Sequence, residues 1–236
     1  MKSPPAHPGL TIGVMARAPI AGRCKTRLAK TLGAESAARL YAAMLADRLA
    51  AVDALPGALR ILLAAPEDDG VAVLRRLAPA GWVILEQRGA DLGERLGNAF
   101  RDLLGNGGLV CLVDSDSPLV SFAILGPELT KPRGPRTVVA GPCEDGGYYL
   151  IGMTSLELGI LHEIPWSTPD VMPKTRERCR TLGLHLEELA EAYDVDESAD
   201  VDRLEHDLRE RPELAPETSA ALRSLFDRRD RSPSAR

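Results

Sequence analysis

The sequence predicts an α/β protein whose central, mainly parallel sheet is covered by helices on both faces. Three times in succession, a short apolar run is followed by a segment with apolar residues at helical spacing. The run 109–113 (LVCLV) is apolar at every position, which is typical of a strand buried on both faces. The chain has 236 residues, 44% hydrophobic and 27% charged, enough for one large domain with a full core.

In the first half, each expected strand is followed by turn-forming residues and then by an expected helix. The expected strands are 10–15, 59–65, 82–85 and 109–113, and the helices between them are 35–52, 71–77 and 92–104. Within 35–52, Leu40, Met44 and Leu45 belong to an apolar stripe suited to packing on a sheet.

The second half changes rhythm. Two expected strands, 137–140 and 148–153, are joined by the glycine-rich turn GPCEDGG, and helical patterns follow at 170–182 and 198–209. We expect this half to add strands of mixed direction and to cover one end of the sheet. No linker divides the chain, so we expect a single domain over 10–226 with flexible ends at 1–9 and 227–236.

Composition excludes several classes of protein. No apolar run approaches the roughly 18–20 residues of a membrane span, and the start MKSPPAHPG lacks the apolar stretch of a secretory signal. The net charge of −5 argues against nucleic acid as the main partner. The four cysteines have no metal-binding spacing, which indicates reduced thiols in a cytoplasmic protein. The sequence does not indicate an oligomeric state.

The segment after the first strand is strongly basic. Between residues 17 and 30 there are five basic residues and no acid. Such a loop before a helix can hold phosphate oxygens through charge-assisted hydrogen bonds, although it is not a Walker A loop. The candidate phosphate-binding residues are Gly22, Arg23, Lys25, Thr26 and Arg27. The alternative is a solvated basic loop without a ligand.

A pair of carboxylates follows the apolar strand 109–113. Asp114 and Asp116 would stand at the carboxyl end of this strand, where open α/β sheets bind ligands. Such a pair can hold Mg²⁺ together with substrate phosphate oxygens. Alternatively, Asp116 or Ser117 caps a helix that begins at Pro118.

The turn 141–147 is a third candidate. Gly146 and Gly147 would allow a ligand close to the backbone, and Asp145 could accept from a ribose or sugar hydroxyl. A simple hairpin turn explains the same residues.

Two further segments precede expected helices. Asp194 and Asp196 could reach a metal, and Ser198 could cap the helix that follows them. Gly93 and Arg95 could face a nucleotide, although a capping box formed by Asp91 and Glu94 would explain the acids there.

Together, these segments resemble the bacterial glycosyltransferase-like family with a GT-A, or nucleotide-diphospho-sugar transferase, fold, whose members include enzymes associated with arsenosugar biosynthesis. The resemblance extends over almost the whole chain and is carried by 22–47, 87–96, 112–120, 140–153, 164–168 and 193–204. It also extends to phospholactate, phosphoenolpyruvate and molybdenum-cofactor guanylyltransferases, which share a KTRL-like loop. Cys24 departs from the pattern, since an aliphatic residue is expected there.

The resemblance implies a three-layer α/β/α fold with a mixed central sheet. It also implies that Asp116, with Asp114 and Asp196, binds Mg²⁺ or Mn²⁺, and that Lys25 and Arg27 bind phosphates. Asp145, Gly146, Gly147 and Tyr148 would lie beside the acceptor or the ribose, and Asp116, Lys25 and Asp145 would take part in catalysis.

The expected function is therefore transfer of a sugar from a nucleotide sugar to a small acceptor. Nucleotidyl transfer from a nucleoside triphosphate to a phosphorylated acceptor, with release of pyrophosphate, is the alternative, and the dense cations at 23–30 favour it. A third hypothesis is a nucleotide-binding protein without catalytic activity.

Overall fold

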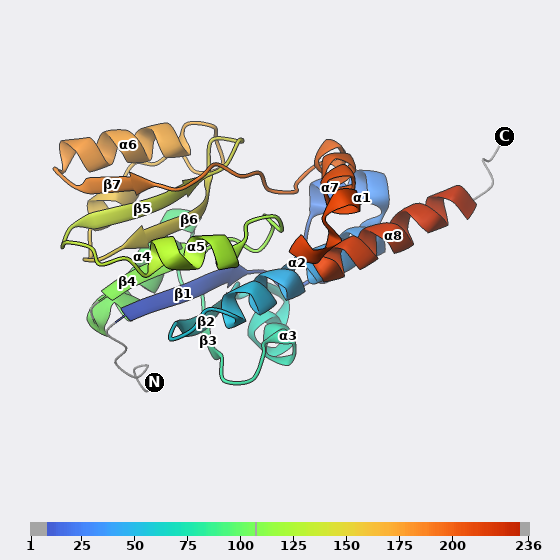
Figure 1. Ribbon diagram of the computed structural model, residues 1–236, viewed down its shortest axis with the longest axis horizontal. Coiled ribbons are helices and arrows are strands. Elements are labelled where there is room, and N and C mark those ends of the chain that lie inside the picture. The colour runs from blue at the N-terminus through green and yellow to red at the C-terminus, as the bar shows by residue number, and fades with distance from the viewer. Residues whose placement is uncertain (1–8, 107, 232–236) are drawn as a thin grey trace.

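A seven-stranded sheet forms the centre of the computed structural model, which describes residues 9–106 and 108–231 (Figure 1). Its strand order is β3-β2-β1-β4-β6-β5-β7. The strands are β1 (Gly9–Ala16), β2 (Leu59–Ala64), β3 (Val83–Glu86), β4 (Gly108–Val113), β5 (Thr137–Pro142), β6 (Tyr148–Met153) and β7 (His185–Glu188). β6 pairs antiparallel with both of its neighbours, and the other pairings are parallel. The predicted mixed, mainly parallel sheet is confirmed.

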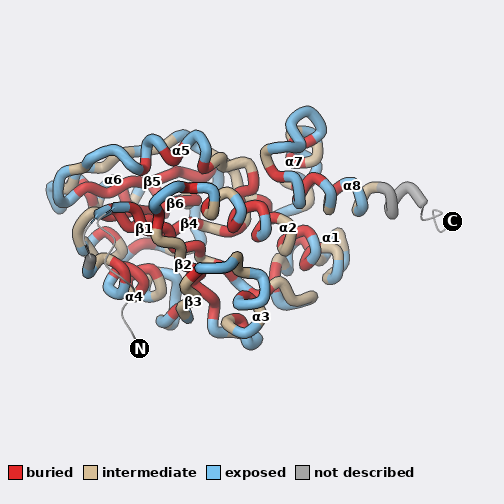
Figure 2. Tube along the Cα trace, turned by 60° about the horizontal axis from the view of Figure 1, so that its bottom comes forward, coloured by how far each residue is buried: buried red, intermediate tan, exposed pale blue. Residues whose placement is uncertain are grey.

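Helices cover both faces of this sheet. One face packs against α2, α3 and α5, and the other packs against α4 and α6. These helices are α2 (Ala34–Asp53), α3 (Gly70–Leu77), α4 (Leu92–Leu103), α5 (Phe122–Leu129) and α6 (Val171–Thr181). Side chains alternate along each strand, so in β4 Cys111 joins the first layer of core and Val110 and Leu112 join the second. Figure 2 shows buried residues concentrated along the strands.

A third group of helices lies beyond the carboxyl ends of the parallel strands. It contains α1 (Thr26–Leu32), α7 (Ser198–Glu210) and α8 (Pro216–Arg231), which pack with the first half of α2 in a separate apolar cluster (Figure 1). The buried Asp47 of α2 anchors the start of α8, because its carboxylate accepts hydrogen bonds from the backbone N–H groups of Glu217 (3.0 Å) and Thr218 (2.8 Å). This cluster holds α1 and α7 beside the sheet edge where the predicted ligand site lies.

The expected strands and helices are all present, with ends within two residues of the predicted ones. Four elements, α1, α5, β7 and α8, were not expected from the sequence. Thr26 and Arg27 therefore lie in the first turn of α1 rather than in a loop. Pro118 does not begin a helix, since the next helix starts at Phe122. That rules out a capping role for Asp116 or Ser117.

The ends of the chain are described in part. α8 continues to Arg231, within the range expected to be a flexible tail, whereas residues 1–8 and 232–236 lie outside the described part of the chain. All four cysteines are free thiols, and all four are buried. Within 9–106 and 108–231, no helix is long and apolar enough to cross a membrane.

Candidate active site

Two cavities meet at the carboxyl edge of the sheet. The first, of about 810 Å³, lies over the ends of β1 to β4 and reaches Gln87 after β3 and Lys25 before α1. The second, of about 450 Å³, lies between the turn after β5, the loop 166–169 and Asp194. Both are lined by Arg27, Leu92, Asp114, Asp116, Ser167 and Asp196. A ligand extending through both cavities would therefore cross the carboxylates of Asp116 and Asp196.

Lys25 connects the two predicted acidic segments. Its Nζ lies 2.7 Å from Asp116 Oδ2 and 2.6 Å from Asp196 Oδ1, and its side chain is only 6% exposed. Burial lowers the pKa of Lys25, but the two carboxylates outweigh burial and raise the pKa overall, so the amine is charged at neutral pH. The residue has a left-handed backbone (φ 43°, ψ 49°), which reverses the chain at the start of α1 and directs Lys25 inward.

The two carboxylates after β4 have different partners. Asp114 accepts a hydrogen bond of 2.8 Å from Arg48 of α2 and another from the Ser117 hydroxyl. Burial raises the pKa of Asp114, and Arg48 opposes that shift. Burial also raises the pKa of Asp116, but Lys25 outweighs it and the net pKa is lowered. Asp116 therefore carries a negative charge toward the cavities, whereas Asp114 mainly fixes the loop.

The segment before α7 brings two more carboxylates to Asp116. The Val195 N–H donates to the Asp116 carbonyl at 3.0 Å, which ties the two loops together. Val195 is fully buried, so both of its acidic neighbours point away from the core. The cap of α7 is Glu197, in a capping box with Asp200, rather than Ser198.

These carboxylates fit a divalent cation. Carboxylate oxygens of Asp116, Asp194 and Asp196 all lie within 4.8 Å of one another. Burial, followed by the charges of the neighbouring acids, raises the pKa of Asp194 to about 6. Such crowding of like charges is what a bound cation relieves, and oxygen donors of this kind suit Mg²⁺ and Mn²⁺. The resemblance implied Asp114 and Asp196 as ligands beside Asp116, whereas this cluster contains Asp194 and Asp196 and does not contain Asp114.

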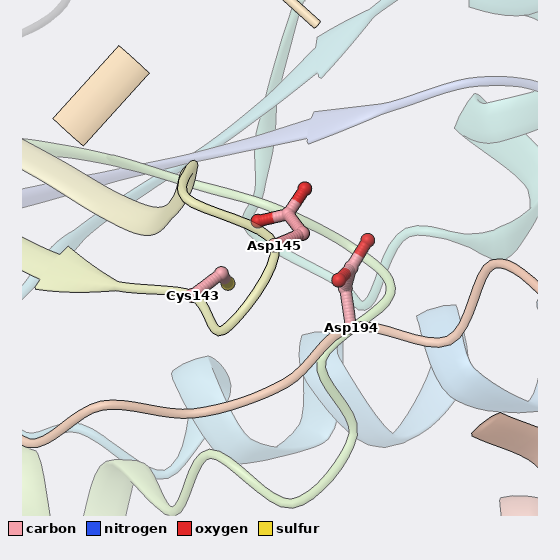
Figure 3. Close-up of side chains that lie close together, drawn as sticks. All are labelled: Cys143, Asp145 and Asp194. Atoms are coloured by element: carbon pink, nitrogen blue, oxygen red, sulfur yellow. The ribbon is translucent and has the colours of Figure 1, made fainter. Parts of the chain in front are cut away.

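The turn after β5 contributes to the second cavity. Figure 3 shows Cys143 and Asp145 of this turn lying close to Asp194. Asp145 Oδ1 accepts from the Gly147 N–H at 2.8 Å, which stabilises the turn. Gly146 has a φ of 88°, and a Cβ there would lie 2.2 Å from the carbonyl oxygen of Pro169, so this position requires glycine. Burial, with the nearby acids, raises the pKa of the Cys143 thiol and keeps it protonated.

Aromatic side chains form another wall of the second cavity. The rings of Tyr148 and Trp166 pack edge to face with centroids 6.3 Å apart. A Cβ on Gly93 would come within 2.4 Å of Trp166 Nε1. Gly93 therefore makes room for the indole, a packing role that differs from the expected contact with a nucleotide.

The remaining predicted phosphate-binding residues differ in position. Arg23, Thr26 and Arg27 line the first cavity, and Arg27 lies 3.5 Å from Asp196. Arg95 also lines this cavity, where it forms an ion pair of 2.6 Å with Glu67. Gly22 lies in the exposed turn before Arg23, with a φ of 76°, and is not part of either cavity wall.

The sequence interpretation missed residues that support the loops. Tyr41 Oη accepts from the Arg17 N–H (3.0 Å) and shares a hydrogen bond with Ser115 Oγ (2.9 Å). Arg48 donates to both Asp114 and the Ser117 carbonyl. A signal for Arg48 was available, because it falls on the apolar stripe of α2 between Leu45 and Val52, where an unpaired charge would be costly.

A family model described as "Uncharacterized protein conserved in bacteria (DUF2064)" matches residues 48–168. The chain belongs to this family. The matched range includes Arg48, the β4 loop with Asp114 and Asp116, and the turn that contains Asp145. A search of curated proteins found no sequence match.

Solved structures show that this DUF2064 chain has the nucleotide-diphospho-sugar transferase fold, as predicted. A protein of Desulfovibrio desulfuricans G20, provisionally named a nucleotide-diphospho-sugar transferase, matches with a TM-score of 0.84 and 28% identity, over 93% of this chain and 97% of that one. The 4-diphosphocytidyl-2C-methyl-D-erythritol synthase of Anaerococcus prevotii DSM 20548 matches with a TM-score of 0.57 and 10% identity, over 86% and 97% of the two chains. A cytidylyltransferase of Leptospira borgpetersenii serovar Hardjo-bovis matches with a TM-score of 0.52 and 13% identity, over 89% of this chain and 97% of that one.

Proposed function

We propose that this protein is a metal-dependent transferase that moves a sugar from a nucleotide-sugar donor to a small acceptor. The observation that carries the proposal is the arrangement of Lys25, Asp116 and Asp196 at the junction of two cavities. One cavity offers cations for a diphosphate, and the other offers acids and aromatic rings for an acceptor. Support also comes from the Desulfovibrio relative, similar over nearly the full length of both chains.

In this proposal the first cavity holds the nucleotide. Arg23, Lys25 and Arg27 bind phosphate oxygens, and the cavity beyond them toward Gln87 receives the nucleoside. Asp116, Asp194 and Asp196 hold Mg²⁺ or Mn²⁺, which supplies positive charge to the phosphates as the bond to the leaving group breaks. Because Lys25 contacts two of these acids, its ammonium group also holds them in place before any ligand arrives.

The second cavity would hold the acceptor. Asp145 lies on its wall and can take a proton from an attacking hydroxyl group, which is the role expected of a general base in an inverting transfer. Gly147 and Tyr148 line the same wall, and Gly146 fixes the turn that positions them. Trp166, which packs against Tyr148, and Ser167 also border the cavity and would limit the size of the acceptor.

Nucleotidyl transfer is the second candidate. The specific observation in its favour is the number of basic side chains along the first cavity, which include Arg17, Arg23 and Lys25 and suit a triphosphate. The fold shared with the Leptospira cytidylyltransferase is compatible with this reaction. A third candidate, nucleotide binding without catalysis, requires that the metal-binding acids be dispensable.

The deciding experiment measures protection from thermal unfolding by nucleoside triphosphates and nucleotide sugars, each with Mg²⁺ or Mn²⁺. A ligand at a hundredfold excess over its Kd stabilises the native state by about 2.7 kcal/mol. Sugar transfer predicts larger protection by one nucleotide sugar than by any triphosphate, together with product formation. The reverse order would favour nucleotidyl transfer, and protection without turnover of any donor would favour the binding protein.

A further inference from the structure

The second cavity contains negative charge without matching positive charge. Asp145 and Asp194 line it, and neither forms an ion pair with a basic residue in the described part of the chain. Of the described residues along its wall, Arg27 is the one that carries a positive charge, and its guanidinium is directed at Asp196.

This charge persists when the metal site is filled. A divalent cation at Asp116, Asp194 and Asp196 would neutralise charge there, and Asp145 is outside that group of three. Asp145 also forms a second group with Cys143 and Asp194, but the protonated Cys143 thiol does not suit Mg²⁺ or Mn²⁺, which prefer oxygen ligands, so the all-carboxylate group is the one that fits the cation. Its one hydrogen bond in the described structure comes from a backbone N–H of its own turn, which leaves the second carboxylate oxygen free to accept from a ligand. A carboxylate in this state attracts hydroxyl donors and repels phosphate or carboxylate groups.

The other walls suit a polyol ring. The packed rings of Trp166 and Tyr148 provide apolar surface on one side of the cavity. Thr168 Oγ1 already donates to the Pro165 carbonyl, so it can accept a further hydrogen bond but offers no second donor. The wall thus offers carboxylate acceptors and apolar surface, and Arg27, its one positively charged residue among those described, is directed at Asp196 rather than left free for an anion.

Resting on the proposed function, we infer that the acceptor is a polyhydroxylated molecule that carries no phosphate or other negative charge, and that Asp145 enforces this choice. The class of acceptor would thus be a sugar or polyol whose hydroxyl hydrogens point at Asp145. The phosphorylated acceptor of the nucleotidyl-transfer alternative would meet repulsion at this wall, because like charges placed side by side disfavour binding.

The test compares matched probes that differ by one phosphate group. Two pools, one of simple sugars and polyols and one of their monophosphates, are added to the protein with Mg²⁺ and a nucleoside diphosphate that protects it from thermal unfolding. Saturation-transfer NMR then reports which members bind. We expect binding from the phosphate-free pool, and at least about tenfold weaker binding of each corresponding monophosphate.

The variant Asp145→Asn keeps an oxygen that can accept from the Gly147 N–H, so the turn should survive. It should reduce the preference for the phosphate-free probe by about tenfold. Glu144→Gln is the matched control, because it removes the same charge from the neighbouring position. Glu144 forms an ion pair of 2.6 Å with Arg203 and is not part of the cavity wall. The preference for the phosphate-free probe should therefore remain unchanged in this variant.

Monophosphates that bind wild-type protein as well as, or better than, their phosphate-free partners would overturn the inference and leave a transferase with a phosphorylated acceptor. Lack of binding by both pools to nucleotide-loaded protein would also overturn it, since the cavity would then accept neither kind of hydroxyl compound. If no nucleotide protects the protein in the first place, the proposed function itself fails.

Discussion

Lys25 Nζ lies 2.7 Å from Asp116 Oδ2, inside a cluster of carboxylates that fits a divalent cation. The same nitrogen contacts Asp196, so one ammonium charge is shared between two of the three acids of the cluster. Both the metal and Lys25 are cations, and they would compete for the same oxygens. In the presence of a nucleotide, the phosphates offer Lys25 an alternative partner, so metal and nucleotide should bind with positive cooperativity.

Lys25→Met should therefore change metal and nucleotide affinities in opposite directions. Without the ammonium group, the bare carboxylates should bind Mn²⁺ at least about tenfold more tightly in the absence of nucleotide, because a repelling charge is removed. Nucleotide affinity should fall, because a phosphate ligand is lost. Titration of free Mn²⁺ by electron paramagnetic resonance measures the first effect.

Lys30→Met provides the matched control for this titration. Lys30 lies in the last turn of α1, the helix that Lys25 precedes, and is exposed. Its replacement should leave the Mn²⁺ affinity unchanged. A Lys25→Met protein that folds normally but binds Mn²⁺ no more tightly than wild type would show that Lys25 and the metal do not compete.

Arg48→Met should be strongly destabilising. Arg48 is 3% exposed and neutralises the partly buried Asp114, which would be left without a cation. Removing one partner from a buried ion pair typically costs about 3–5 kcal/mol. In contrast, Arg88→Met breaks a pair with Asp102 whose arginine side chain is 56% exposed, and should cost no more than about 1 kcal/mol. Urea unfolding measures both values, and similar losses for the two variants would contradict the assigned role of Arg48.

Asp194→Asn should stabilise the metal-free protein at neutral pH. The folded-state pKa of Asp194 is raised to about 6, so its ionisation opposes folding. Between about pH 4 and 6 the folded protein keeps a proton that the unfolded chain has released, and stability falls as the pH rises through this window. Asp194→Asn does not lose stability in this way. Its free energy of unfolding should exceed that of wild type by on the order of 1 kcal/mol at pH 7, and the difference should vanish near pH 4.

Thermal unfolding of both proteins in a chelating buffer across this pH range measures the difference. The same variant should bind Mn²⁺ more weakly, since one ligand carboxylate is replaced by an amide. If Asp194→Asn were as much more stable than wild type at pH 4 as at pH 7, ionisation of Asp194 would not be the cause of the difference in stability.

The sequence was sufficient to predict most strands of the sheet, because they are short apolar runs with clear ends. It did not predict α5 or β7. The helix α5 contains Gly126 and Pro127, which argue against a helix locally, and it forms because Phe122, Leu125 and Leu129 are buried against the sheet. The edge strand β7 (HLEE) has one apolar residue, so alternation could not identify it, and pairing with β5 determines its conformation.

The same contrast holds in the candidate site. Carboxylates directly after strand ends could be located by pattern alone, and the structure brings Asp116, Asp196 and Lys25 together. The pairing of Asp114 with Arg48 depends on how α2 packs against the β4 loop. Likewise, the fit of Gly93 beneath Trp166 joins segments distant in sequence, and no local spacing reports such a contact.

The central claim is that Asp116 holds a cation that binds the nucleotide, and Asp116→Asn tests it most directly. The measurement is nucleotide affinity by calorimetry, with Mg²⁺ and with a chelator, for wild type, this variant and the remote control Asp102→Asn. We predict that Mg²⁺ tightens nucleotide binding to wild type and to the control. In Asp116→Asn, the ratio of the affinities with Mg²⁺ and with chelator should be at least about tenfold smaller. Equal Mg²⁺-dependent affinity in the variant and in wild type would contradict the account.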